Sequence, residues 1–364
     1  MECFANVLFV MALGMLLVGC GSAQLSELSP SPTALISSDS LSAESSLSKS
    51  SLGRSMLVSP SPLVVNGDRL WQSLEAIVGF DDRFSGVGRS KVRSFLVGEL
   101  TGLGWKVEQQ VFTDKDGVEA ENLIATKTWG DTSAIAAQRW IVGAHYDTIE
   151  NTPGADDNGT GVAALLELAH LFAGVSIKTD IPVSLELIFF DLEEAGLQGS
   201  FAYTQRPENL EGLQGAIVLE MLGYACVVPG CQQYPKNLLI EPPSDRGDFL
   251  AVVGDAEHPE MLAGFSPDVQ GQFIPSDLTD LKIFTLSVPL KGALTPDVLR
   301  SDHAPFWLQD IGAVMVTDTA YLRNPHYHQV TDTLETIDRP FFVRSSQAVA
   351  NALGYYLGKG AESE

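Results

Sequence analysis

Short apolar runs alternate with segments of helical periodicity through the middle of this 364-residue chain. Runs typical of buried strands occupy residues 140–144, 183–190, 216–219 and 314–317, and helical spacing marks residues 161–172 and 340–357. Strands and helices that alternate in this way form layered folds around a sheet with mostly parallel strands. The sequence therefore predicts an α/β fold with a mixed, mostly parallel central sheet flanked by helices.

The segments on either side extend this pattern to one domain over residues 67–358. Apolar residues at helical spacing predict helices over 70–78 and 88–100, and strand character follows at 105–112 and 122–126. Residues 225–300 are rich in Pro, Gly and Asp and contain one clear strand, at 249–253. We expect this segment to leave the sheet and to roof the functional site.

The first 20 residues have the features of an export signal. The apolar stretch over 4–18 is short for a membrane span, and Leu17-Val18-Gly19-Cys20 resembles the lipobox of bacterial lipoproteins. Residues 1–9 depart from the usual pattern because they carry Glu2 and no Lys or Arg. An ordinary cleaved signal with an incidental cysteine is the alternative. The lipobox predicts a protein of the cell envelope, anchored through a lipid on Cys20 and facing the periplasm or the exterior.

A serine-rich stretch over 21–66 follows the signal and predicts a flexible tether. The chain as a whole is acidic, with 46 Asp and Glu against 22 Lys and Arg and a formal charge of −24. Such a surface repels phosphate backbones, which argues against nucleic acid as a partner. Beyond the signal, Cys226 and Cys231 flank a turn-like insert and predict either a small disulfide loop or two free thiols.

Ionisable residues follow the predicted strands at their carboxyl ends. The 140–144 run leads into His145 and Asp147, the 183–190 run into residues 191–194, and the 216–219 run into Glu220. Residues 326–328 follow the last strand after a loop, and residues 154–159 open the helix 161–172. In open α/β sheets, ligands bind outside the carboxyl ends of the strands. We therefore expect five clusters of histidine and carboxylate to meet at one edge of the sheet.

Imidazole and carboxylate groups without a thiol are typical of zinc sites and, less exclusively, of manganese or cobalt. Two metal ions ~3.5–4 Å apart need a bridging carboxylate and further ligands for each ion. We assign Asp156 as the bridge, Glu194 and His328 to one ion, and His145 and Glu220 to the other. His326, two residues before His328, competes with it for this position.

Five segments resemble the zinc aminopeptidase and glutaminyl cyclase family of co-catalytic metallopeptidases, in order along residues 84–342. They are GAHYDT (143–148), PGADDNGTG (153–161), FFDLEEAGLQGS (189–200), SDHAPF (301–306) and NPHYHQVTDTLETID (324–338). Matched position by position, the resemblance implies metal ligands at His145, Asp156, Glu194, Glu220 and His328. It also implies a general base at Glu193 and an acid at Asp147 that orients His145. Glu220 departs from the pattern, because the family more often has Asp there.

The expected reaction is hydrolysis by water activated between two Zn²⁺ ions, with Glu193 taking its proton. The resemblance implies that a free α-amine is held near the metals, which predicts an aminopeptidase acting on peptides with a free N-terminus. Two alternatives remain: a glutaminyl-peptide cyclotransferase that uses one zinc, and a non-catalytic lipoprotein that binds peptides or metal. The pair Asp302-His303 is expected near the site as a supporting or substrate-contacting pair.

Overall fold

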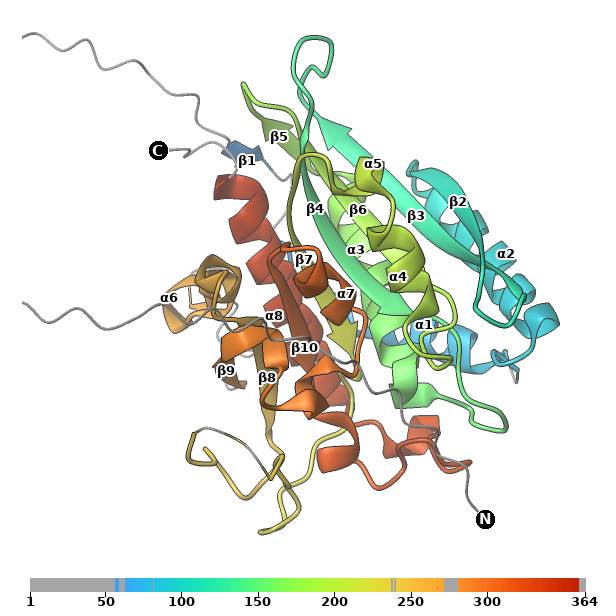
Figure 1. The fold of residues 1–364 in the computed structure, drawn as a ribbon, viewed down its shortest axis with the longest axis vertical. Coiled ribbons are helices and arrows are strands. Elements are labelled where there is room, and N and C mark those ends of the chain that lie inside the picture. The colour runs from blue at the N-terminus through green and yellow to red at the C-terminus, as the bar shows by residue number, and fades with distance from the viewer. Residues whose placement is uncertain are drawn as a thin grey trace, which may run out of the picture. The chain divides into compact units, whose positions relative to one another are not determined.

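An eight-stranded mixed sheet in the order β2-β3-β6-β4-β7-β10-β8-β9 organises the protein, seen in a computed structural model (Figure 1). The structure describes residues 56–58, 63–80, 82–236, 238, 240–271 and 281–359. The sheet strands are β2 (Lys106–Thr113), β3 (Glu119–Trp129), β4 (Gln138–His145), β6 (Val183–Phe190), β7 (Leu213–Glu220), β8 (Phe249–Asp255), β9 (Lys282–Val288) and β10 (Ala313–Thr317).

The four central strands run parallel, in the order β6-β4-β7-β10. The flanks bring in the antiparallel pairings of β2 with β3, β3 with β6 and β10 with β8, while β9 pairs parallel with β8. All eight residues of β6 are buried, as a near-continuous apolar run in a covered parallel strand should be. The predicted mixed, mostly parallel sheet is confirmed.

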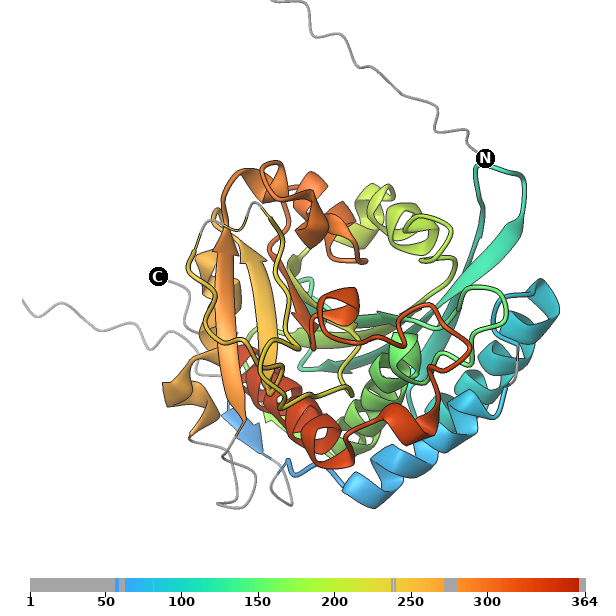
Figure 2. The same cartoon turned by 90° about the horizontal axis from the view of Figure 1, so that it is seen from below.

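Helices cover both faces of the sheet (Figure 2). One face carries α1 (Gly67–Val78), α2 (Gly86–Gly102), α3 (Gly161–Ala173) and α8 (Arg339–Lys359). The other carries α4 (Gln198–Thr204), α5 (Pro207–Leu210) and α7 (Ala304–Leu308). Shorter elements complete the chain: β1 (Met56–Val58), β5 (Ser176–Lys178), α6 (Pro267–Gln270), and the helical turns η1 (Ala155–Thr160), η2 (Pro259–Phe265), η3 (Pro289–Gly292), η4 (Pro296–Leu299), η5 (Ala320–Leu322) and η6 (Leu334–Thr336).

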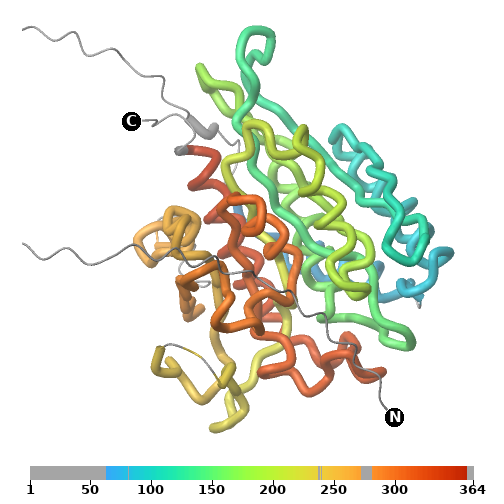
Figure 3. The backbone as a smooth tube through the Cα atoms, viewed as in Figure 1, coloured from blue at the N-terminus to red at the C-terminus, as the bar shows by residue number. Residues whose placement is uncertain are grey.

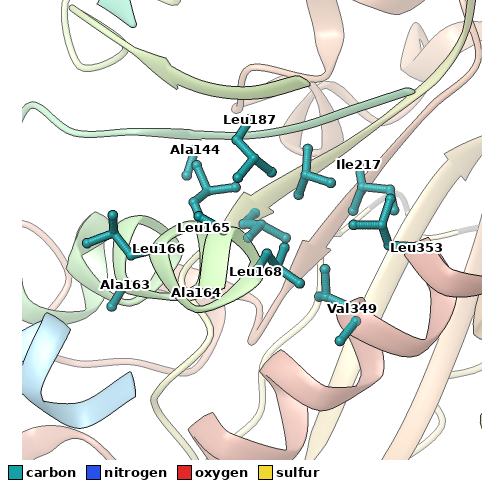
Figure 4. Packing of buried hydrophobic residues seen from close by; sticks show 14 of the residues in the cluster. Ala144, Ala163, Ala164, Leu165, Leu166, Leu168, Leu187, Ile217, Val349 and Leu353 are labelled. Atoms are coloured by element: carbon teal, nitrogen blue, oxygen red, sulfur yellow. The ribbon is translucent and has the colours of Figure 1, made fainter. Parts of the chain in front are cut away.

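The main core lies between the sheet and the α3–α8 face (Figure 4). Leu165 and Leu168 of α3 are buried together with Ile217 of β7 and with Val349 and Leu353 of α8. Full burial of one such leucine stabilises the fold by about 1.5–3 kcal/mol. This packing fixes α3, and therefore fixes the turn η1 that precedes it, against the carboxyl ends of the central strands.

The helices and strands predicted from the sequence are present, with ends that shift by a few residues and with β3 longer than expected. The segment 225–300 differs from the prediction, because β8 and β9 both belong to the sheet instead of leaving it. Figure 3 follows the chain from β7 through the connection 221–248 to β8. In this connection the sulfur atoms of Cys226 and Cys231 form a disulfide, which settles the alternative of two free thiols.

The predicted signal over 1–20 and the lipobox cysteine Cys20 lie outside the described residues. Most of the predicted tether over 21–66 does as well. Within that range β1 pairs antiparallel with β5, and Val65 is buried in the core with its backbone N–H donated to the side chain of Gln347. Among the described helices, none combines the length and apolar character that crossing a bilayer requires.

Candidate metal centre

The predicted ionisable residues meet at the carboxyl edge of the parallel strands. His145 is the last residue of β4 and Glu220 the last of β7, while Glu193 and Glu194 follow β6. Asp157 reaches the same edge from η1, and His328 from the loop between β10 and α8. Parallel strands bring these ends together because their carboxyl termini share one edge of the sheet.

One group of donor atoms lies around His145. Its Nε2 atom is 3.4 Å from Oδ1 of Asp157 and 3.7 Å from Oε2 of Glu220. One ligand atom from each of the three residues lies within 4.8 Å of the others. The hydroxyl of Ser301 donates a hydrogen bond of 2.7 Å to the same Glu220 oxygen and holds that carboxylate in place.

A second group lies around His328. Its Nε2 atom is 3.1 Å from Oε2 of Glu194 and 3.3 Å from Oδ2 of Asp157. The two groups therefore share Asp157, which turns one carboxylate oxygen toward each histidine. A carboxylate between two donor sets is the arrangement that a pair of neighbouring cations requires.

Asp157 is the carboxylate that both donor groups share, and Asp156, predicted from the sequence for this position, belongs to neither group. The Asp156 carboxylate is fully buried and accepts hydrogen bonds from the Gly223 backbone N–H at 2.9 Å and from Asn324 Nδ2 at 2.8 Å. Consecutive residues of the irregular turn η1 point their side chains to different sides. Asp156 therefore ties the loops after β7 and β10 to this turn, and Asp157 faces the histidines.

Three buried, unpaired atoms support the interpretation of this centre as a cation site. His145 Nε2, His328 Nε2 and Asp157 Oδ2 are buried and have no hydrogen-bond partner. Buried polar atoms are otherwise almost always paired, so unpaired atoms that face one another need an explanation. Imidazole nitrogens and carboxylate oxygens are the donors that zinc sites use. The residues of both groups thus fit divalent cations.

Burial and mutual repulsion shift the pKa values of these groups. Burial raises the pKa of the Glu194 carboxyl to about 7, and the Asp157 charge adds to this effect. Burial alone would lower the pKa of His328, but the neighbouring carboxylates of Asp157 and Glu194 outweigh it and raise the pKa to about 10. Burial also raises the pKa of Glu193 well above its usual range, against the opposing charge of His145. Such crowded acids favour a cation, whose binding displaces their protons.

Asp147 connects the predicted base to the ligands. Its two carboxylate oxygens accept the backbone N–H groups of Glu193 and Glu194, at 3.1 and 3.2 Å. Oδ1 also lies 3.4 Å from Nδ1 of His145, the ring nitrogen that faces away from the donor group. Carboxylates in this position orient metal-binding histidines and raise their basicity. The geometry agrees with the orienting role that the resemblance implies for Asp147.

Glu193 lies beside the centre without entering either donor group. Its Oε2 atom is 3.9 Å from Nε2 of His145, and its side chain is buried. Asp302, also buried, raises the pKa of Glu193, and the pKa of Asp302 itself is raised to about 7, chiefly by burial. The expected position of Asp302 near the site is thus observed, whereas His303 turns away and its Nε2 lies 2.7 Å from the Val298 carbonyl oxygen.

The remaining histidines lie outside both donor groups. His326, the competitor of His328, has its Nδ1 atom 2.9 Å from the hydroxyl of Thr331. His258 has Nδ1 3.0 Å from an Asp255 oxygen, and His170 is half-buried on α3. The choice of His328 over His326 therefore agrees with the geometry.

Arg83 is a buried residue of this region that the sequence analysis did not single out. Its guanidinium donates to the carbonyl oxygens of Tyr146, Pro153 and Gly154, at 3.0, 3.0 and 2.7 Å. These carbonyls lie at the two ends of the connection 146–154, which joins His145 at the end of β4 to the turn η1 that carries Asp157. Burial lowers the pKa of Arg83 to about 10, and nearby carboxylates oppose this shift. Arg83 thus ties the two ends of this connection together and places a positive charge behind an acidic site.

Arg83→Met should lower the free energy of unfolding by about 3 kcal/mol, because it leaves buried carbonyl oxygens without a donor. The shift of the urea midpoint measures this effect. The matched control is Arg246→Met, since Arg246 is exposed, and it should leave the midpoint unchanged. Equal midpoints for the two variants would contradict the role given to Arg83.

An apolar cavity of about 130 Å³ adjoins the first donor group. Glu220 forms part of its wall, and Tyr327, the neighbour of His328, forms another part. Its apolar lining includes Phe249, Val253, Phe284, Leu286 and Met315, from β8, β9 and β10, together with Tyr234, Pro235 and Leu238 from the connection 221–248. Residues of the segment predicted as a roof therefore form part of the wall of this cavity.

Comparison with known proteins finds similarity to a peptidase family over part of the chain. Residues 122–239 match the sequence profile of peptidase family M28. The chain is 37% identical over 210 residues to the uncharacterized protein YfbL of Escherichia coli, covering 54% of this chain and 61% of that protein. It is 29% identical over 266 residues to the "Probable lipoprotein aminopeptidase LpqL" of Mycobacterium tuberculosis, covering 71% of this chain and 50% of that protein. The chain thus spans between half and about three-fifths of the lengths of these relatives.

Solved structures share the fold at low sequence identity. The zinc aminopeptidase BSAP of Bacillus subtilis superposes with a TM-score of 0.62 at 14% identity, over 81% of this chain and 96% of that one. Glutaminyl cyclase of Porphyromonas gingivalis superposes with a TM-score of 0.59 at 18% identity, over 81% of this chain and 100% of that one. The profile match and the relatives agree that this chain is similar to peptidase family M28, and the solved structures share its fold.

Proposed function

We propose that this protein is a metal-dependent aminopeptidase that hydrolyses the N-terminal residue from peptides. The observation that carries the proposal is a pair of donor groups that share Asp157, with the Glu193 carboxylate beside them and outside both. The family match and the relatives named as aminopeptidases support a peptidase-type enzyme.

His145, Asp157 and Glu220 would hold one cation, and Asp157, Glu194 and His328 the other. Two Zn²⁺ ions suit this donor set, and they supply acidification of water and polarisation of a carbonyl group. Glu220 accepts a hydrogen bond from Ser301, which orients the carboxylate despite its extra methylene relative to Asp. We therefore infer that both positions are filled in the active protein.

Glu193 is the proposed general base. Its buried carboxylate has a raised pKa and is held by backbone hydrogen bonding of its own N–H to Asp147. It takes a proton from the attacking water and then delivers that proton to the leaving amine of the peptide. Burial raises the pKa of this carboxyl group, which strengthens it as a proton acceptor.

The surroundings suit a substrate with a free N-terminus. The centre is rich in carboxylates, which attract the ammonium group of an unblocked peptide. The apolar cavity beside Glu220 offers a place for the first side chain, with a floor of buried Phe249 and Met315. We infer a preference for large apolar N-terminal residues such as leucine.

Hydrolysis of Leu-Gly-amide and of its N-acetyl derivative tests the proposal. Free leucine should appear from the unblocked peptide alone, and a chelator should abolish its release until Zn²⁺ is restored. Equal cleavage of the blocked peptide would contradict an exopeptidase. Ammonia released from glutaminyl peptides without any free amino acid would identify a glutaminyl cyclase instead.

We also infer attachment to the cell envelope through Cys20, in line with the name of LpqL as a lipoprotein. Fatty-acid labelling of the wild-type protein that persists in Cys20→Ser would contradict this inference.

A further inference from the structure

A second cavity, of about 360 Å³, opens on the other side of the centre. Glu194 and Asp147 form part of its wall, so it adjoins one member of the second donor group. The first cavity extends from Glu220 toward β8, β9 and β10, whereas this one lies toward α2 and the β2–β3 hairpin. The two cavities therefore flank the centre along the sheet edge.

The outer rim of the second cavity is apolar. Phe84, just before α2, and Val118, in the β2–β3 turn, both line it. Their side chains are 49% and 45% exposed, although each is a large apolar residue. Ile149 and Leu192 add apolar surface from the loops after β4 and β6. A ligand side chain placed here would cover surface that water now contacts, which is favourable in proportion to the area buried.

The charges around the second cavity disfavour an acidic ligand. Asp114, Asp147 and Glu194 line it. Arg89 is the basic residue among its lining side chains, but its Nε lies 2.7 Å from Oδ1 of Asp191 and it also donates to the Phe84 carbonyl oxygen. Its charge is therefore already compensated. The lining thus offers no unpaired basic side chain to a carboxylate, and Asp114 would repel one.

Under the proposed function the first cavity takes the side chain of the terminal residue, and the second cavity lies on the other side of the centre. Phe84 and Val118 at its rim are half-exposed, so the rest of a peptide can continue past them into solvent. We propose that the second cavity binds the side chain of the substrate's second residue, the first residue of the leaving peptide, and prefers a large apolar one. This inference rests on the proposed aminopeptidase function.

The test compares leucine release from leucinamide, Leu-Gly-amide, Leu-Phe-amide and Leu-Asp-amide. The wild-type protein should show a kcat/KM for Leu-Phe-amide on the order of tenfold above that for Leu-Gly-amide, with Leu-Asp-amide the poorest dipeptide. Phe84→Ala and Val118→Ala should each remove most of the preference for phenylalanine. Both variants should cleave leucinamide with the wild-type kcat/KM, because this substrate has no second side chain.

Val111→Ala is the matched control, since Val111 lies on β2 with 48% exposure and does not line the cavity. It should retain the wild-type preference. Binding gives a readout apart from turnover: in the Glu193→Gln background, Leu-Phe-amide should bind more tightly than leucinamide, and Phe84→Ala should remove the difference.

The outcomes separate the two proposals. Equal kcat/KM values for all second residues, with leucinamide cleaved, would overturn the subsite alone. The subsite would also be overturned if Phe84→Ala lowered kcat/KM for leucinamide as much as for Leu-Phe-amide, because the cavity would then bind the first residue. No leucine from any substrate, together with equal binding of both ligands in the Glu193→Gln protein, would overturn the aminopeptidase function and the subsite together.

Discussion

Glu193→Gln is expected to lower kcat by about 10²–10⁴-fold, the range attributed to a positioned general base. Glutamine keeps the size of the side chain and cannot take a proton from water. Because Glu193 stands outside both donor groups, the metal content per chain and the affinity for uncleaved substrate should stay at wild-type values. Single-turnover kinetics with metal analysis of the same sample measures both quantities.

The control for this variant is Glu167→Gln, which changes a buried carboxylate on α3 that pairs with Arg69. It should leave kcat unchanged. A Glu193→Gln protein with full activity would remove the base assignment, and one that lost its metal would show that Glu193 is a ligand.

Asp157→Asn should weaken cation binding at both donor groups at once. Asparagine has the shape of aspartate but offers one oxygen and no charge, so neither histidine keeps its carboxylate partner. Substitution of groups that merely support a metal ligand costs about 10–100-fold in affinity, and loss of the shared ligand should cost at least about 100-fold. Metal per chain after dialysis should fall below one, and activity should fall with it.

Asp156→Asn distinguishes the two adjacent carboxylates. Asp156 bonds to Gly223 and Asn324, so its substitution should lower the free energy of unfolding while metal per chain remains at two. Metal loss in Asp156→Asn with retention in Asp157→Asn would restore the assignment made from the sequence and contradict the observed geometry.

The sequence could predict where the site lies because of a general property of parallel strands. Residues that follow the apolar runs must meet at one edge, and His145, Glu194 and Glu220 do so. It could not distinguish Asp156 from Asp157, since two consecutive acidic residues in an irregular turn carry no period that assigns a face. The distinction depends on the loops after β7 and β10, whose Gly223 and Asn324 bind Asp156.

Other features of the structure could not be predicted from the sequence. β9 has several exposed and half-buried positions at the sheet edge, so it lacks the continuous apolar run that marks β6. Arg83 follows two aspartates in a short loop and resembles an ordinary surface residue, because its partners are backbone carbonyls that any sequence could supply. The second cavity combines Phe84, Val118 and Glu194 from three separate segments, and their proximity follows from the sheet order.

Anomalous diffraction at the zinc absorption edge, from crystals of the protein grown with Zn²⁺, tests the central claim most directly. The account predicts two peaks that share the Asp157 carboxylate, one bounded by His145 and Glu220 and the other by Glu194 and His328. A single peak, or a pair joined by Asp156, would contradict it.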